Sequence, residues 1–308
     1  MTFTSAIKRT AALTVLLLFG LEVPHAQRSG APAAARPKPI VFAVLNDGKS
    51  IEPIGYFEKN SFASTIDGAS QEDAIFAFHK TYYRAGTKYR LIFGGADAGT
   101  LRVNSSDPTA ECSRNAAEVA YTSQRARLRG NVMAIATNIP ATTKGSGVRR
   151  LPTATERTEI EALVRAYLTD QKLAAATVRT LKYHNLTAVD ADGDGNAELI
   201  GTFWVEPART SRALLFFIAE REQNGKYSFA YSDYRLIKQD DVMSGEIAHL
   251  DEGVYHERLL ELLDTDGDGT AEIFTYIQSF EGAGFNVYRR EKGKWKLMFE
   301  AANYRCAF

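Results

Sequence analysis

One nine-residue acidic pattern occurs twice in this chain of 308 residues, and it constrains the fold more than any other feature. The first copy, DADGDGNAE, covers residues 190–198, and the second, DTDGDGTAE, covers residues 264–272. Both copies have glycine at position 6, where a tight turn with positive φ is most easily made. Residues with high strand propensity follow each copy, LIGTFWV after the first and IFTYI after the second. The pattern therefore predicts two loops that each lead into a β-strand.

The spacing of the acids in these loops suits a calcium ion. Carboxylates at positions 1, 3, 5 and 9 can wrap around one point, and Ca²⁺ takes six to eight oxygen ligands. Mg²⁺ prefers a tighter octahedron and retains water, and zinc prefers the histidine and cysteine that both loops lack. Position 7 is expected to contribute its backbone carbonyl, so its side chain can vary. We therefore expect two Ca²⁺ sites with these residues: Asp190, Asp192, Asp194, Asn196 and Glu198 in the first, and Asp264, Asp266, Asp268, Thr270 and Glu272 in the second.

The loops differ from an EF-hand at position 12, where that motif has a bidentate glutamate and this chain has Gly201 and Thr275. They resemble instead the calcium loops of FG-GAP or VCBS-type repeats, the blade units of integrin α-like β-propellers, in which D-x-D-x-D-G-x-x-[DE] precedes an apolar strand. The resemblance is specific over the two loops and loose over residues 182–304. It implies that the matching acids bind calcium. Only two such units are visible, whereas propellers close with four to eight blades, and the phenylalanine-glycine signature of the family is absent before the loops.

The rest of the sequence favours a mainly β (α+β) protein. Strand-like runs at residues 40–45, 88–93 and 132–137 predict an N-terminal β-rich domain over residues 40–150, and Asn46-Asp47-Gly48 predicts a two-residue hairpin turn. We expect a connecting helix within residues 151–177 and an antiparallel C-terminal β domain over residues 178–308 that carries both calcium loops. The alternative is a degenerate β-propeller whose other blades lie hidden in the N-terminal half.

The connecting helix has a clear start signal. Thr153 and Glu156 have the spacing of a capping box. One apolar stripe at helical spacing follows and predicts the face that packs on the core. Its members are Ile160, Leu163, Val164, Tyr167 and Leu168.

The first 26 residues have the order of a secretory signal peptide. Lys8 and Arg9 precede the apolar run AALTVLLLFGL, and Ala26 is a small residue at a plausible cleavage site. Residues 27–39 are rich in alanine and proline and predict a linker. We expect a secreted or periplasmic protein with no membrane span after cleavage; the alternative is an uncleaved anchor.

The chain contains two cysteines, Cys112 and Cys306. An exported protein meets an oxidising compartment, so one disulfide between them is the expected pairing. The alternative is two buried free thiols.

Composition and motifs favour binding over catalysis. The formal net charge is +0, which gives no general attraction to nucleic acid. The glycine-rich stretch at residues 94–99 lacks the lysine of a phosphate-binding loop and predicts a turn. No catalytic residue is assigned. We expect a non-catalytic calcium-binding protein that presents a surface to a protein or a glycan. The alternative is a secreted hydrolase, with glycosides as candidate substrates, that uses Asp251 and Glu257 near His249 and His256.

Overall fold

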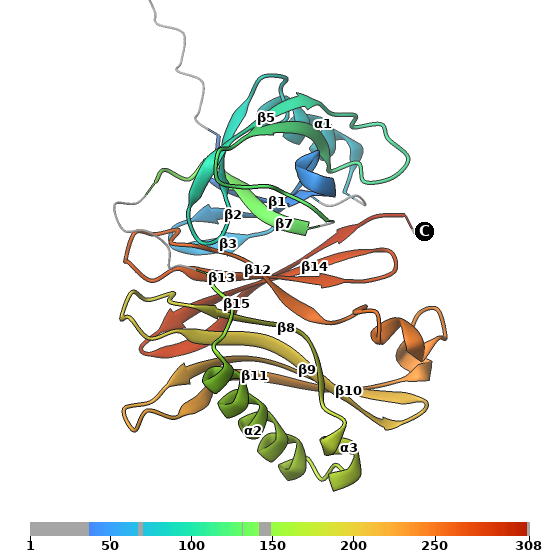
Figure 1. Cartoon of the computed structure of the whole chain (residues 1–308). Helices are drawn as coiled ribbons and strands as arrows, with labels where there is room; N and C mark the ends of the chain where they lie inside the picture. The colour runs from blue at the N-terminus through green and yellow to red at the C-terminus, as the bar shows by residue number, and fades with distance from the viewer. Residues whose placement is uncertain (1–36, 67–69, 131, 142–148, 307–308) are drawn as a thin grey trace, which may run out of the picture. The chain divides into compact units, whose positions relative to one another are not determined.

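The structure, a computed structural model, describes residues 37–66, 70–130, 132–141 and 149–306 and is mainly β (Figure 1). The predicted signal peptide and residues 27–36 of the predicted linker lie outside these residues. The strands of the N-terminal half are β1 (Ile40–Leu45), β2 (Ser50–Glu58), β3 (Ser61–Ala63), β4 (Lys88–Ile92), β5 (Asp97–Ser105), β6 (Ala117–Thr122) and β7 (Val132–Thr137). Six of them form a closed barrel in the order β1-β7-β4-β5-β6-β2, because β1 also pairs with β2, and β3 extends the sheet from β2.

Alternate side chains of β1 pack into two different apolar clusters, one on each face of the strand. Ile40, Phe42 and Val44 belong to the core that includes helix α1 (Glu72–Tyr82). Val41 and Ala43 belong to a second cluster that includes residues of the C-terminal half. Successive residues of a strand point to opposite faces, and both faces are covered here, so β1 is apolar throughout.

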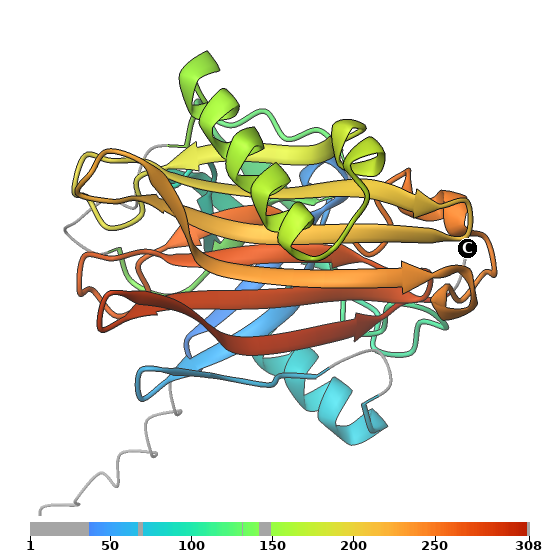
Figure 2. The same cartoon turned by 90° about the horizontal axis from the view of Figure 1, so that it is seen from below.

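The C-terminal half forms two four-stranded antiparallel sheets, each in simple up-and-down order. The first consists of β8 (Lys182–Val189), β9 (Glu198–Ala208), β10 (Ser211–Arg221) and β11 (Tyr227–Lys238). The second consists of β12 (Glu257–Leu263), β13 (Glu272–Gln278), β14 (Gly282–Glu291) and β15 (Lys294–Tyr304). Ile200 and Phe216 of the first sheet pack against Leu262 and Ile273 of the second. The two sheets therefore lie face to face, as Figures 1 and 2 show.

Each sheet is covered on its other face as well. Helix α2 (Ala154–Asp170) packs on the first sheet through Ile160, Val164 and Leu168, all 0% exposed, which confirms the apolar stripe. The capping box of Thr153 and Glu156 is also present. The barrel covers the second sheet (Figure 1). The short helices are α3 (Ala175–Arg179), η1 (Asn46–Gly48), η2 (Gln239–Asp241) and η3 (Ile247–Leu250).

Two expectations differ from the structure. The described residues of the N-terminal half form a barrel rather than hidden propeller blades, and the outer faces of the two C-terminal sheets are occupied by α2 and the barrel. These residues therefore do not form a closed propeller. The connection between β1 and β2 has four residues rather than two, because Leu45 pairs with Ser50.

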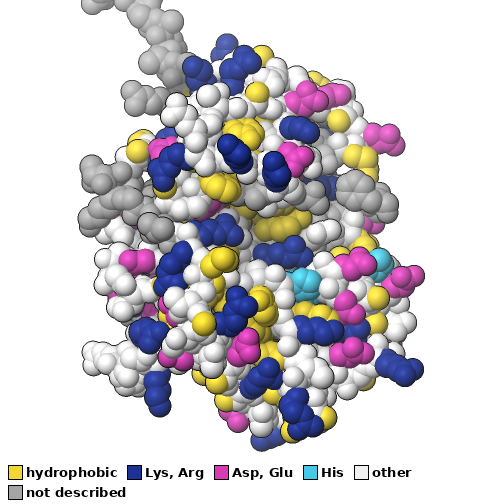
Figure 3. Space-filling view, in the orientation of Figure 1, with side chains coloured by type: hydrophobic (Ala, Val, Ile, Leu, Met, Phe, Trp, Pro, Cys, Tyr) yellow, Lys and Arg dark blue, Asp and Glu magenta, His cyan; other side chains and the backbone are white. Residues whose placement is uncertain are grey.

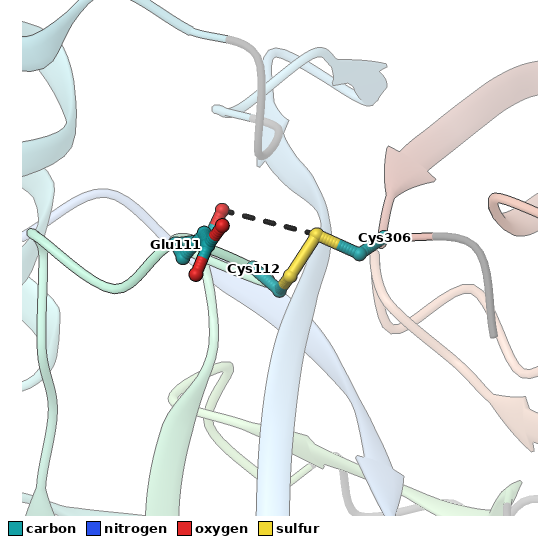
Figure 4. Close-up of a disulfide and its surroundings, with 3 residues drawn as sticks. All are labelled: Glu111, Cys112 and Cys306. Atoms are coloured by element: carbon teal, nitrogen blue, oxygen red, sulfur yellow. Dashed lines mark hydrogen bonds between the residues drawn. A yellow bond between two sulfur atoms is a disulfide. The ribbon is translucent and has the colours of Figure 1, made fainter.

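The C-terminal strand is fastened to the barrel by a disulfide. Cys112 and Cys306 are bonded, with their Cα atoms 5.4 Å apart, which confirms the predicted pairing. The Cys306 Sγ lies 3.9 Å from the Glu111 carbonyl oxygen (Figure 4). The neighbouring Arg305 forms an ion pair with Glu52 of β2, which is 0% exposed. Contacts group the chain from Pro37 onward as one compact unit.

The described surface has no single dominant charge in the view of Figure 3. Basic and acidic side chains are interspersed over this face, in keeping with the net charge of +0. Among the described residues, no helix is both long enough and apolar enough to cross a membrane.

Candidate metal centres

The two acidic loops occupy the same place in the two C-terminal sheets. The first joins β8 to β9, and the second joins β12 to β13, so each connects the first and second strands of its sheet. In the first loop, Gly193 and Gly195 have φ of 72° and 86°, and a β-carbon at either position would meet nothing within 4 Å. Backbone conformation, rather than lack of space, therefore calls for glycine at these two positions.

Backbone amides hold the aspartates in the same way in both loops. The carboxylate at position 1 accepts from the amide at position 6, the one at position 3 from position 5, and the one at position 5 from position 7. Donor–acceptor distances are 2.6–3.2 Å, and the donor–acceptor pairs are Gly195–Asp190, Asp194–Asp192, Asn196–Asp194, Gly269–Asp264, Asp268–Asp266 and Thr270–Asp268. Each bond turns a carboxylate toward the inside of its loop. The loop sequence thus sets the positions of three acids at once.

This arrangement gathers two aspartate triads. In each triad one carboxylate oxygen from every member lies within 4.8 Å of the others, and the triads are Asp190, Asp192 and Asp194, and Asp264, Asp266 and Asp268. Oxygens bound to one Ca²⁺ at 2.3–2.6 Å are separated by no more than about 5 Å. In the described part of the chain, the buried Asp190 Oδ1 has no hydrogen-bond partner. A buried carboxylate oxygen without a donor fits a site that holds a cation. The corresponding oxygen of the second loop, Asp264 Oδ1, accepts from the Gly267 amide at 2.7 Å. By the spacing of their carboxylates, both triads could hold a metal ion.

The glutamates at position 9 lie outside both triads. Glu198 Oε2 accepts from the Ala191 amide at 2.7 Å, and Glu272 Oε2 accepts from the Thr265 amide at 2.9 Å. These residues therefore tie the end of each loop back to its second residue. Burial raises the pKa of Glu198 to about 8 and also raises the pKa of Glu272. For Asn196 and Thr270 the expected role of the backbone carbonyl stays a prediction.

Two arginines that the sequence analysis missed reach the loops from β14. Arg290 Nη1 contacts Asp192 Oδ2 of the first loop. Arg289 Nε donates to Glu272 Oε1 at 2.7 Å, and its Nη2 lies 3.6 Å from Asp266 Oδ2. The sequence shows only two consecutive arginines near the end of a strand, a pattern that does not indicate which carboxylates they meet. These guanidinium groups offset part of the negative charge that each loop collects.

The loops are also joined directly to each other. The Ala271 amide of the second loop donates to the Ala191 carbonyl of the first at 2.7 Å. Because Arg290 also crosses from the second sheet to the first loop, a change of structure in one loop would act on the other. The two triads therefore form one region at the same end of the stacked sheets.

The acids named for the alternative hydrolase have other partners. Asp251 accepts from Arg212 Nε and Nη2 at 2.6 and 2.9 Å. Glu257 is 2% exposed, and its Oε1 accepts hydrogen bonds from Thr275, Asn286 and Tyr288. Burial raises the pKa of Glu257. A carboxylate enclosed in this way is not presented to a substrate.

Comparison with known proteins gave no match. No protein-family model matches the chain, and neither a curated protein nor a solved structure matches it with statistical significance. The functional conclusion therefore depends on the geometry of the loops.

Proposed function

We propose that this is an exported, non-catalytic calcium-binding protein whose two ions stiffen adjacent loops and so present a surface to a protein or a glycan. The observation that carries the proposal is the pair of aspartate triads, each within 4.8 Å, at equivalent positions of two sheets. Carboxylate and carbonyl oxygens without histidine or cysteine favour Ca²⁺ among the common protein-bound ions. The signal-like residues 1–26 support export to a compartment where calcium is abundant.

The repulsion within each triad explains why a bound cation would stabilise the loops. Three carboxylates close together repel one another, by about 4 kcal/mol for a pair at 4 Å and an effective dielectric constant near 20. Arg289 and Arg290 offset part of this repulsion through Glu272, Asp266 and Asp192. A divalent ion would remove more of it and would hold three points of each loop at once. The surface formed by the two joined loops would then be rigid only with calcium bound.

Calcium is expected to stabilise the fold against heat. Weak extracellular sites have Kd of about 10⁻⁴–10⁻³ M, so two sites at 10 mM Ca²⁺ would add about 3–5 kcal/mol to the free energy of unfolding. This corresponds to a rise in Tm of roughly 5–9 °C for a protein of this size. Scanning calorimetry with calcium, with an equal concentration of magnesium, and after chelation measures the effect directly. An unchanged Tm in calcium would contradict the proposal.

A paired substitution separates calcium binding from general loss of charge. Asp194→Asn with Asp268→Asn removes one carboxylate from each triad and keeps an oxygen that can accept the bond from position 7. This variant is expected to lose most of the calcium-induced rise in Tm. The matched control is Asp170→Asn with Asp240→Asn, which removes two exposed carboxylates outside the loops and should retain the rise.

A further inference from the structure

Residues Gln239–Tyr255, which form all but the last residue of the connection between β11 and β12, are held against the side of the first sheet. The apolar anchors Val242, Ile247 and Leu250 of this segment form one buried cluster with Trp204 and Leu214. Near its end, Arg235 Nη2 donates to the Tyr255 carbonyl at 2.8 Å. Tyr255 itself has φ of 65°, a conformation that costs a residue other than glycine free energy. The C-terminal end of this 239–255 segment is closed by these contacts, by the Tyr255 amide donating to the Gln278 carbonyl at 2.9 Å and by Arg212 donating to Asp251.

Two histidines meet at that end. His256, which directly follows the segment, is 0% exposed, and its ring centroid lies 4.2 Å from that of His184 in β8, with the planes at 74°. Trp204 lies 6.1 Å from both rings. Neither ring nitrogen of His256, nor Nε2 of His184, makes a hydrogen bond of normal geometry in the described part of the molecule, although the Leu250 carbonyl is close enough to act on both rings. The structure thus brings a fully buried imidazole, His256, into contact with a half-buried one, His184.

The charges around this pair are unfavourable to a proton. Arg258 of β12 donates from Nη2 to the Gly253 carbonyl at 2.8 Å, and a β-carbon built on Gly253 would meet the Arg258 guanidinium on one side and His184 on the other. The nearby carboxylates are already engaged, Asp251 by Arg212 and Glu257 by Thr275, Asn286 and Tyr288. The charged and titratable groups around the pair are Arg258 and Glu257 on β12, Arg235 on β11, Arg212 on β10, Lys182 on β8, and His249 and Asp251 in the segment.

We propose that the His184–His256 pair makes the 239–255 segment an acid-released flap, which is closed while both imidazoles are neutral and opens when they take up protons. Opening would expose Trp204 and Leu214 beneath the segment, so the protein would gain an apolar surface in acid. The device needs no metal ion and is independent of the calcium loops.

The direction of the pH effect follows from linkage. Burial, together with the neighbouring His184, Arg258 and Arg235, lowers the pKa of His256 to about 3, although the Leu250 carbonyl opposes the shift. Burial, followed by Arg258, also lowers the pKa of His184. The opened segment leaves both rings in water, where an ordinary pKa is about 6.5. The pair therefore stabilises the closed segment fully above pH 6.5, and this stabilisation is lost as the pH falls below 6.5. For each histidine that stays neutral in the closed state, the opening equilibrium constant rises about tenfold per pH unit.

Hydrogen–deuterium exchange of the segment, corrected for the intrinsic pH dependence of amide exchange, measures the opening. Between pH 6.5 and 4.5 the opening equilibrium is expected to rise about 50-fold from His256 alone and further from His184. Peptides from α2 should not follow this dependence. A segment whose opening is independent of pH from 7.5 to 4.5 would overturn the proposal.

Variants assign the effect to the two rings. His256→Phe keeps an aromatic ring that cannot take a proton, and it should reduce the pH dependence to the part due to His184; with His184→Gln added, the dependence should vanish. His249→Gln is the matched control, because His249 lies in the same segment but faces Glu246 and Glu252 and should leave the dependence unchanged. If the double variant opens with the same pH dependence as the wild type, the proposal is wrong. Should His256→Phe fail to fold, exchange at the C2 carbon of His256 in the wild type tests the same point, since the proposal requires His256 to remain neutral and protected in the closed state down to pH 5.

Discussion

Reducing the Cys112–Cys306 disulfide is expected to lower the free energy of unfolding by about 5 kcal/mol at most. The two cysteines are 194 residues apart in the sequence, so the bond closes most of the described chain into one loop. Loop closure removes conformational freedom from the unfolded chain, and the loss grows slowly with loop length. Residual structure in the unfolded chain reduces the effect, which makes the figure an upper value. The bond also fastens the end of β15 to the barrel.

Guanidinium unfolding with and without a reductant measures this change. The variant Cys112→Ser with Cys306→Ser is the control, since its unfolding should match that of the reduced wild type and should not respond to the reductant. Equal stability of the oxidised and reduced wild type would show that the bond adds nothing to the fold.

The second large effect is expected at Glu261 of β12. This carboxylate is 0% exposed and accepts from the amides of Gly94 and Gly95, both at 2.7 Å. The two glycines have φ of 67° and 74°, so that consecutive amides point at one anion. Glu261→Leu would leave both buried amides without an acceptor and should cost about 3–5 kcal/mol of stability. Gly94 and Gly95 belong to the barrel half and Glu261 to the second sheet. The substitution should therefore weaken mainly the contact between the barrel and the second sheet.

Glu261→Gln is the matched variant, because its amide oxygen can still accept one of the two bonds. It is expected to lose about 1–3 kcal/mol. Denaturant unfolding of the three proteins gives the order wild type, Gln, Leu. Equal losses for Gln and Leu would show that the side-chain volume, rather than the hydrogen bonds to the glycines, decides the effect.

The sequence analysis predicted the features that depend on neighbouring residues. The capping box of Thr153 and Glu156 was predicted because the two residues serve each other within one helical turn. The aspartate triads were predicted because amides within each loop orient the acids. The glutamates at position 9 accept from the Ala191 and Thr265 amides, and their expected role as calcium ligands stays a prediction.

Apart from the disulfide, the features that join distant segments were not predicted. Arg290 and Asp192 are 98 residues apart, and Gly94 and Glu261 are 167 apart. The stretch at residues 94–99 predicted only a turn, and nothing in it indicates that its amides bind a carboxylate of β12. The contact of His184 with His256 likewise depends on how one sheet lies on the other.

By itself, the sequence determined a mainly β chain, the start of α2, the pairing of its two cysteines and two loops that each gather three carboxylates. These outcomes depend on local backbone preferences, on short-range hydrogen bonds and, for the disulfide, on there being two cysteines. Only the tertiary structure decided that residues 40–137 close into a barrel and that both outer faces of the stacked sheets are covered. It also decided that two arginines reach the loops and that two histidines lie in contact. The physical reason is that strand order and sheet stacking are set by the burial of many apolar side chains at once, and the apolar pattern of a single strand does not specify its partner.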